Sequence, residues 1–268
     1  MDGLFYPARS DQLATLVDQL LASSPTPEGS RFAAVSPHAG YELAGPVIAS
    51  AFRSVALHRA RTVVLMGPVH RDPQPGFFLP ESEVFSTPLG EIPVDEHVAS
   101  LLLHQSPAFT RNDIFHLEEH CIEVQLPFLA RVFPGAAVVP ILVGSRGQAA
   151  VASLSAGLGA AVAEDPDATV CIVSSNMASY MAGKDADSEC AAAESLISAG
   201  DWAGMISAEE KRRISACGAT AIAALLRVAG QGARIEILSR ASSREKEEDP
   251  ARTVHYAAIG FDNEPGAD

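Results

Sequence analysis

The sequence predicts a three-layer α/β sandwich, in which a central mixed, mostly parallel β-sheet is flanked by helices. Short continuous runs of valine, isoleucine and leucine recur along the chain, as expected for strands that are covered on both faces. Segments with apolar residues at helical spacing lie between these runs, and this alternation is typical of layered α/β domains. The chain has 268 residues, 47% of them hydrophobic. This is enough for one large core, so we expect a single domain over residues 1–268.

The expected elements follow one another along the whole chain. The first is an amphipathic helix, because apolar residues recur at helical spacing from Leu13 to Leu21 after a serine-aspartate start. Strands are then predicted at 32–36, 62–66, 76–79, 138–143, 169–174, 234–238 and 254–261. Helices are predicted at about 43–56, 94–105, 119–132, 148–163, 186–199 and 216–229.

Two stretches of biased composition are predicted to be irregular. Residues 71–95 are rich in proline and are expected to form a long excursion with short extended pieces inside the same domain. Residues 242–252 are a charged run between two apolar segments, which favours a solvated loop. Pro127 is expected to kink the predicted helix at 119–132.

The charge and cysteine content exclude several classes of function. The formal net charge is −14, from 33 acidic and 19 basic residues, which argues against binding to nucleic acid or to an anionic membrane. The four cysteines form no C-x-x-C pair, so neither a disulfide framework nor a zinc knuckle is predicted. The start has no signal-peptide pattern, and no apolar stretch reaches membrane-spanning length. We therefore expect a cytoplasmic protein.

Three polar stretches follow predicted strands. "SPHAGY" and "GPVH" follow the first two strands, and "SSNMASY" follows the strand at 169–174. Ligands of open α/β sheets bind at the carboxyl ends of strands, so His38 and His70 are expected to come together there and to bind a metal. The alternative is that each is a hydrogen-bonded structural histidine.

Cys217 is the third candidate ligand. It precedes the apolar run "GATAIAALL", and the N-terminal end of a helix lowers the pKa of a thiol. The alternative is that Cys217 packs in the core as a small hydrophobic residue. Two imidazoles and a thiolate favour zinc, copper or iron over magnesium or calcium.

The stretch "HLEEH", residues 116–120, offers a competing metal motif. It satisfies the H-x-x-E-H pattern of one zinc-peptidase class, in which His116 and His120 share a helix face and Glu119 is the general base. The alternative is a capped, partly exposed helix start, with Glu123 one turn later. No dinucleotide, P-loop or hydrolase-elbow motif occurs.

The ordered set of stretches resembles the Memo family, which in bacteria and archaea includes protein B of the AmmeMemoRadiSam system. The matching stretches extend from residue 3 to residue 261. They are "GLFYPARSDQLATLVDQLL", "SPHAGYELAGPVIASAF", "VVLMGPVH", "FSTPLGEIPVDEHV", "EEHCIEVQLPFL", "VPILVG", "VSSN", "CGATAIAALL" and "VHYAAIGF". The resemblance implies the fold of the class III extradiol ring-cleaving dioxygenases, which are non-haem iron enzymes.

The resemblance also implies roles for particular residues. The metal ligands of the family correspond to His38, His70 and Cys217, and the implied metal is copper or iron, with zinc as a further choice. A helix that borders the family's pocket corresponds to Glu119, His120 and Glu123. The resemblance therefore leaves His116 outside the site, and it makes His120 and Glu123 available for proton transfer.

The chain departs from the family pattern beside the predicted site. Asn176 replaces an aspartate, and Ser179 replaces the histidine that corresponds to the general base of the ring-cleaving enzymes. Serine does not exchange a proton near neutral pH without a partner, so His120 or His255 would have to take over that role. Arg71 replaces a second histidine, where it either holds an anionic substrate or points to solvent.

Two classes of function follow from these observations. In the first, the protein is a metalloenzyme that activates oxygen or a small substrate at His38, His70 and Cys217. In the second, it is a non-catalytic module whose pocket captures a small molecule or a peptide, without metal. A zinc peptidase is the third alternative, and a homodimer is the default assembly.

Overall fold

The central sheet of the protein contains nine strands, and its main path runs in the order β10-β11-β1-β8-β2-β7-β3-β6. A computed structural model describes residues 2–26, 29, 31–71, 74–245 and 252–262, so most of the predicted loop at 242–252 lies outside the described residues. The strands of the sheet are β1 (Ala33–Ser36), β2 (Thr62–Pro68), β3 (Phe77–Leu79), β6 (Phe109–Arg111), β7 (Ala137–Val143), β8 (Thr169–Ser174), β9 (Ala178–Met181), β10 (Arg234–Ser242) and β11 (Thr253–Asp262).

The middle of the sheet is parallel and both of its edges contain antiparallel pairs. β1, β8, β2 and β7 pair in parallel, and so do β3 and β6. β11 is antiparallel to β1, β9 and β10, and β3 is antiparallel to β7. The carboxyl ends of β1, β8 and β2 therefore lie side by side, which brings the segments after them to one edge of the sheet.

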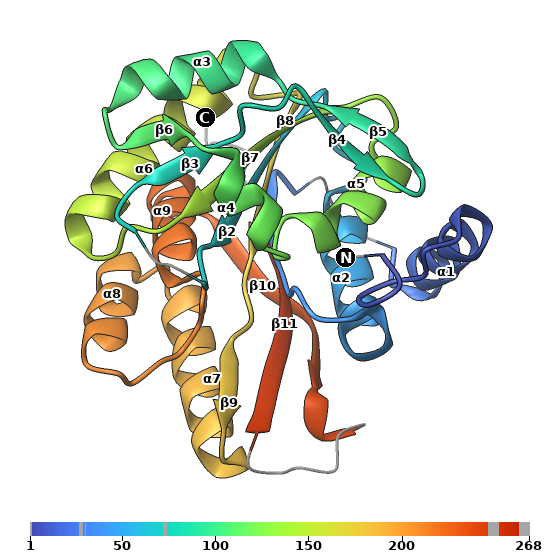
Figure 1. Ribbon diagram of the computed structural model, residues 1–268. Helices are drawn as coiled ribbons and strands as arrows, with labels where there is room; N and C mark the ends of the chain where they lie inside the picture. The colour runs from blue at the N-terminus through green and yellow to red at the C-terminus, as the bar shows by residue number, and fades with distance from the viewer. Residues whose placement is uncertain (1, 27–28, 30, 72–73, 246–251, 263–268) are drawn as a thin grey trace.

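Helices cover both faces of this sheet, as Figure 1 shows. On one face lie α3 (Glu96–Gln105), α6 (Gln148–Glu164), α7 (Gly183–Ser198), α8 (Trp202–Glu210) and α9 (Ala219–Ala229). On the other lie α1 (Ser10–Ser23), α2 (Tyr41–Val55) and α5 (Leu126–Val132). Each face has its own hydrophobic core. The mixed, mostly parallel sheet between two helical layers confirms the predicted fold class.

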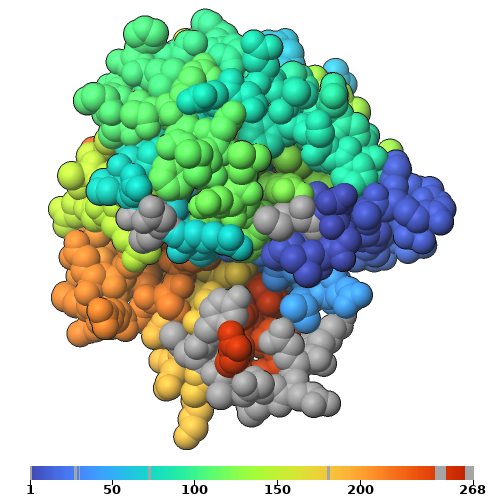
Figure 2. Space-filling view, viewed as in Figure 1, coloured from blue at the N-terminus to red at the C-terminus, as the bar shows by residue number. Residues whose placement is uncertain are grey.

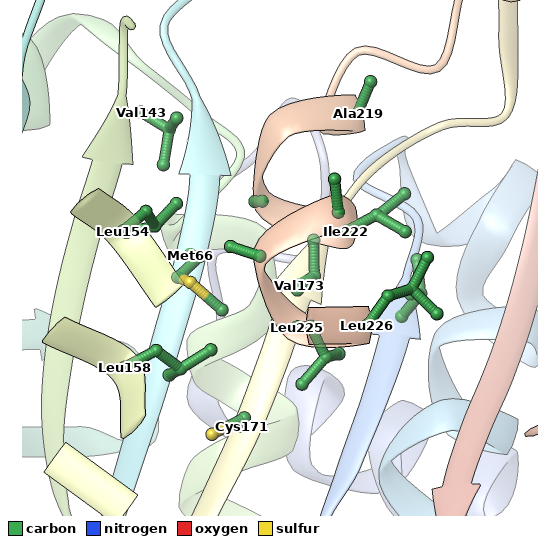
Figure 3. Close-up of a cluster of buried hydrophobic side chains, with 14 of the residues drawn as sticks. Met66, Val143, Leu154, Leu158, Cys171, Val173, Ala219, Ile222, Leu225 and Leu226 are labelled. Atoms are coloured by element: carbon green, nitrogen blue, oxygen red, sulfur yellow. The ribbon is translucent and has the colours of Figure 1, made fainter. Parts of the chain in front are cut away.

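The α9 helix packs closely on the middle of the sheet. Figure 3 shows Ile222 and Leu225 of α9 beside Met66 of β2 and Val173 of β8, with α6 alongside. All four side chains are fully buried. The alanines of α9 let its backbone approach the sheet, and this contact fixes the position of the residues just before the helix, including Cys217.

The segment between β6 and α5 differs from the prediction. Instead of one helix at 119–132, the structure has α4 (Asp113–Glu118), a break, the 3₁₀ turn η1 (Glu123–Gln125) and then α5. Pro127 is the second residue of α5, where a missing N–H costs nothing, so the predicted kink is wrong. The proline-rich stretch does contain the expected short extended pieces, β3 and the hairpin β4 (Val84–Thr87) and β5 (Gly90–Pro93).

Gly67 lets this broken segment lie against β2. A Cβ at Gly67 would lie 2.6 Å from Cys121 Sγ, which in turn donates a hydrogen bond to the Pro68 carbonyl (3.2 Å). We expect Gly67→Ala to lower the free energy of unfolding by about 1–3 kcal/mol through overpacking. Urea denaturation measures the change, and Gly67→Ala/Cys121→Ala should recover part of it. If the double variant loses as much free energy of unfolding as the two single variants added together, the steric explanation is contradicted.

None of the helices in the described part of the chain combines the length and the apolar character needed to cross a membrane.

Candidate metal centre

His38, His70 and Cys217 come together at the carboxyl edge of the sheet. His38 follows β1, His70 follows β2, and Cys217 immediately precedes the start of α9. One ligand atom from each lies within 4.8 Å of the others, and Cys217 Sγ is 3.4 Å from His38 Nε2. The convergence expected from strand ends is therefore present in the structure.

Ser174 orients the ring of His38. Its hydroxyl donates to the Cys121 carbonyl (2.8 Å) and lies 2.9 Å from His38 Nδ1. Because this hydroxyl has only one proton to donate, His38 Nδ1–H must donate to Ser174 Oγ. With Nδ1 engaged by Ser174, Nε2 is the nitrogen of the buried His38 that faces the sulfur of Cys217, as a metal ligand requires.

Glu119 orients the ring of His70. Its Oε2 lies 2.8 Å from His70 Nδ1, and its Oε1 accepts the backbone N–H groups of His70 and Arg71. Glu119 is only 2% exposed, and hydrogen bonds from His70 and from these amides overcome burial and lower its pKa. A carboxylate that holds Nδ1 of a histidine is a common support for a metal ligand, because it leaves Nε2 free to coordinate.

The electrostatics favour a thiolate at Cys217. Burial alone would raise the pKa of this thiol, but His38 and His70 hold the pKa well below its usual value. The predicted lowering of the Cys217 pKa is present, and the neighbouring imidazoles are its cause. Burial lowers the pKa of His70, but hydrogen bonds to Cys217 and Glu119 outweigh it and raise the pKa to about 9.

His120 is the third imidazole of the site. Its ring centroid lies 5.3 Å from those of both His38 and His70, and its other face stacks on Phe5 at 4.9 Å. Burial and the charges of His38 and His70 lower its pKa to about 4, so His120 is neutral at neutral pH. Figure 2 shows the N-terminal segment that carries Phe5 in blue, below the cyan and green surface.

Asn176 connects β8 to Cys217. Its backbone N–H donates to Cys217 Sγ (3.2 Å), and its side-chain Oδ1 accepts the His38 N–H (3.2 Å). The next turn is close-packed, because a Cβ at Gly218 would lie 2.7 Å from Ser175 Cβ. Asn176 therefore positions two candidate ligands without a charge of its own.

Among the described residues, no hydrogen bond joins the other predicted residues to the three ligand atoms. Glu123 accepts a hydrogen bond from Tyr6 Oη at 2.9 Å. His255 lies 2.9 Å from Asp187, and Arg71 is exposed. Ser179 is on β9, and among the described residues its side chain has no hydrogen bond to the candidate ligands. Of the two histidines considered as replacements for the missing imidazole, the structure brings only His120 to the site.

The structure contradicts the interpretation of "HLEEH" as a zinc-peptidase helix. α4 ends at Glu118, so His116 and His120 do not share a helix face. His116 Nε2 donates to the Phe78 carbonyl (3.0 Å), and Glu119 is engaged by His70. The alternative of a capped, partly exposed helix start is also wrong, because Glu119 is buried at the end of α4.

A second group of possible ligands, His70, Glu119 and Cys121, overlaps the first. In this group Glu119 already accepts three hydrogen bonds. Burial raises the pKa of the Cys121 thiol, which donates to a backbone carbonyl instead. This second group therefore supports His70 rather than forming a separate site.

Sequence reasoning missed Gln125 as a supporting residue. Its fully buried amide donates to Ser174 Oγ and to the Pro37 carbonyl, and accepts from Ser36 Oγ. The available signal was a polar residue in the apolar run "CIEVQLPFL", since a buried amide needs hydrogen-bond partners.

We expect Glu119→Gln to weaken metal binding by about 10- to 100-fold without unfolding the protein. The amide N–H group of glutamine would face donors at His70 and Arg71, so the ring of His70 would lose its support. Competition with a chromophoric chelator for Zn²⁺ measures the affinity. Glu118→Gln, on the exposed end of α4, is the matched control, and equal affinities of the two variants would contradict this role.

The chain is similar to known proteins over nearly its whole length. A family model described as Memo-like protein matches residues 1–260. A MEMO1 family protein of Thermoplasma acidophilum is 31% identical over 96% of this chain and 95% of its own length. A MEMO1 family protein of Thermotoga petrophila is 33% identical over 97% of both chains, and one of Methanopyrus kandleri is 31% identical over 97% of this chain and 96% of its own. The chain therefore belongs to the Memo family.

Proposed function

We propose that this Memo protein binds one transition metal ion through Nε2 of His38, Nε2 of His70 and Sγ of Cys217, and uses it for redox or oxygen-dependent chemistry on a small molecule. One observation carries the proposal. The three ligand atoms lie together, while Nδ1 of each histidine is engaged by Ser174 or Glu119. Both rings are therefore held with Nε2 available for coordination.

The donor set restricts the choice of metal. Two imidazole nitrogens and a thiolate suit copper, iron or zinc, whereas magnesium and calcium prefer oxygen ligands. Three protein ligands also leave coordination positions for a substrate, as in catalytic metal sites. When bound, copper or iron would supply one-electron chemistry, and zinc would act as a Lewis acid.

His120 is our candidate for proton transfer. It lies beside both candidate histidine ligands, so it is the group placed to accept a proton from a substrate. Phe5 stacks on the ring and fixes its orientation. In this scheme Glu123 acts indirectly, by holding Tyr6 in place, because its carboxylate already accepts a hydrogen bond from the Tyr6 hydroxyl.

A non-catalytic ligand-binding module is the second candidate. The observation that favours it is Ser179, which stands where the family's histidine is expected and which has no side-chain hydrogen bond to the three candidate ligands among the described residues. In that case the pocket would bind a small molecule or peptide without turning it over.

Loading with Co²⁺, Cu⁺, Fe²⁺ and Zn²⁺ in separate anaerobic samples tests the metal proposal. We expect one ion per chain, and for Co²⁺ a thiolate charge-transfer band that is lost in Cys217→Ser. Cys190→Ser, at a buried position on α7, is the control that should keep the band. Failure of all four metals to bind would overturn the metal site and leave the non-catalytic module.

A further inference from the structure

A groove lies between the β4–β5 hairpin and the segment that runs from α4 to α5. Its volume is about 230 Å³. Val84, Phe85 and Ser86 line it on the side of the hairpin, and Leu117 and Leu126 line it on the other side. None of the three candidate metal ligands belongs to its lining, so this groove is a surface separate from the candidate metal centre.

Apolar side chains are exposed around this groove. Leu117 is 80% exposed, and Ile114, one turn earlier on α4, is 63% exposed. Val84, on the hairpin side, is 41% exposed. These are three of the five large apolar side chains that are exposed in the described part of the chain. Exposed apolar surface is therefore concentrated here, as expected for a site that contacts another molecule.

The β4 strand has one open edge. The hairpin forms a two-stranded sheet of its own, and the chain after β5 is joined to β7 by the bridge between Val94 and Val138. The Val94 N–H donates to the Glu83 carbonyl (2.8 Å), so these two residues form a hydrogen-bonded pair. Because such pairs alternate along an antiparallel ladder, Val84 and Ser86 point their N–H and C=O groups away from β5. Among the described residues these four groups have no hydrogen-bond partner.

The groove runs along this open edge. Successive side chains of a strand point to opposite faces, so a groove over one face would be lined by every second residue. Here three successive residues, Val84, Phe85 and Ser86, line it. This is the arrangement expected for a groove that follows the edge of the strand. An extended segment in the groove would therefore lie beside β4 and could pair with it as a third strand.

The surroundings of the groove are acidic. Asp113 and Glu123 line it, and Glu83 and Glu118 are exposed next to it in sequence, one on each side. From the hairpin to η1 the only lysine or arginine is Arg111, which forms an ion pair with a glutamate of α3. A basic molecule is therefore attracted to this surface, and an acidic one is repelled.

We propose that this groove docks an extended segment of a partner protein in which basic and apolar residues alternate. The backbone of the segment pairs with the open N–H and C=O groups of Val84 and Ser86. Its apolar side chains fill the groove between Phe85 and Leu117, and its lysine or arginine side chains face the surrounding carboxylates. This interaction is separate from the proposed function and does not require a bound metal.

The test is an NMR titration of the ¹⁵N-labelled, metal-free full chain with the peptide acetyl-KVKLKVK-amide. We expect the amide signals of Val84, Ser86 and Leu117 to shift. At saturation the N–H groups of Val84 and Ser86 should exchange with solvent at least about tenfold more slowly, because they become hydrogen-bonded. The peptide acetyl-EVELEVE-amide has the same apolar residues and the opposite charge, and it should bind at least about tenfold more weakly.

Two N-methylated peptides test whether a strand is added. One carries N-methyl groups on its lysines, and the other carries them on its valines and leucine. Successive backbone N–H groups of a strand point to opposite edges, so only one of these peptides loses the N–H groups that face β4. That peptide should bind about tenfold more weakly than the parent, and the other should keep the parent affinity. Equal affinities of the two would overturn the pairing with β4.

Variants of the protein locate the binding. Leu117→Gln should weaken binding of the lysine peptide by about tenfold, because it removes apolar contact area from an exposed position. Leu57→Gln, at another exposed leucine, is the matched control and should leave the Kd unchanged. Glu83→Gln/Glu118→Gln should weaken binding at low salt and reduce its dependence on salt. An unchanged Kd in Leu117→Gln would place the peptide elsewhere and contradict the proposal.

The remaining outcomes concern other occupants of the groove. Absence of binding by the lysine peptide, or equally tight binding of the glutamate peptide, overturns a basic partner. If dilution of the free protein shifts the signals of Val84, Ser86 and Leu117, the groove is covered by a second copy of this chain. That result would replace the partner protein by self-association.

Discussion

Replacing His38 and His70 together by alanine is expected to lower the affinity for Zn²⁺ or Cu⁺ by about 1,000-fold or more. Two of the three ligand atoms that lie within 4.8 Å of one another would be removed, and a lone thiolate does not hold a metal ion in a defined geometry. His38 is buried, so the variant also loses some packing. Circular dichroism and the unfolding midpoint of the metal-free proteins must therefore be compared before the metal content is interpreted.

The matched control is His97→Ala/His104→Ala, which removes two exposed histidines on α3. Neither belongs to a candidate metal group among the described residues. Elemental mass spectrometry after reconstitution and removal of loose metal should find near-stoichiometric metal in the control and in wild type, and almost none in His38→Ala/His70→Ala. Retention of metal by the latter variant would show that the ion binds elsewhere.

The sheet could be predicted because the strands have a simple physical signature. β2, β7 and β8 are covered on both faces, so nearly all of their residues are apolar and buried, and the sequence shows them as continuous runs. The helix expected at 119–132 shows the limit of this reasoning. Its apolar spacing is helical, but Glu119 is drawn into hydrogen bonds with the backbone after β2, which breaks the helix there. A contact between distant segments cannot be read from local periodicity.

The candidate ligands could be predicted for a similar reason. His38 follows β1 and His70 follows β2, the two parallel neighbours of β8, so topology alone brings them to one edge. The groups that orient them could not be predicted, because Ser174, Glu119 and Gln125 act through hydrogen bonds across 49 to 136 residues of sequence. Sequence also could not decide between His120 and His255, whereas the structure brings His120 to the site through its contact with Phe5.

The same topology explains how the family fold tolerates serine at position 179. The three candidate ligands are held by the ends of β1 and β2 and the start of α9, and Ser179 lies on β9, which pairs with β11 at one side of the sheet. The arrangement of the three candidate ligands therefore does not depend on the residue at position 179. His120, which lies beside His38 and His70, is the imidazole that the structure brings to the candidate ligands in its place.

His116 is expected to make the protein markedly less stable as the pH falls below neutral. Its ring is largely buried, donates from Nε2 to the Phe78 carbonyl and lies against Phe85. Burial, partly offset by the hydrogen bond to Phe78 and by Asp113, lowers its pKa from 6.5 to about 4. At pH values between these two limits the unfolded chain binds a proton at this position and the folded chain does not. The contribution is therefore fully present above pH 6.5 and is lost as the pH falls towards 4.

Each pKa unit corresponds to about 1.4 kcal/mol, so wild type should lose up to about 3 kcal/mol more stability than His116→Gln over this interval. Glutamine retains an N–H donor for Phe78 but does not titrate. Urea denaturation of the chelator-treated proteins across the interval measures the difference, and contributions from His120 and the carboxyl groups cancel because both proteins share them. His104→Gln, at an exposed histidine of α3, should run parallel to wild type. Parallel curves for wild type and His116→Gln would mean that folding does not change the pKa of His116, and that its ring is open to water beside Phe78 and Phe85.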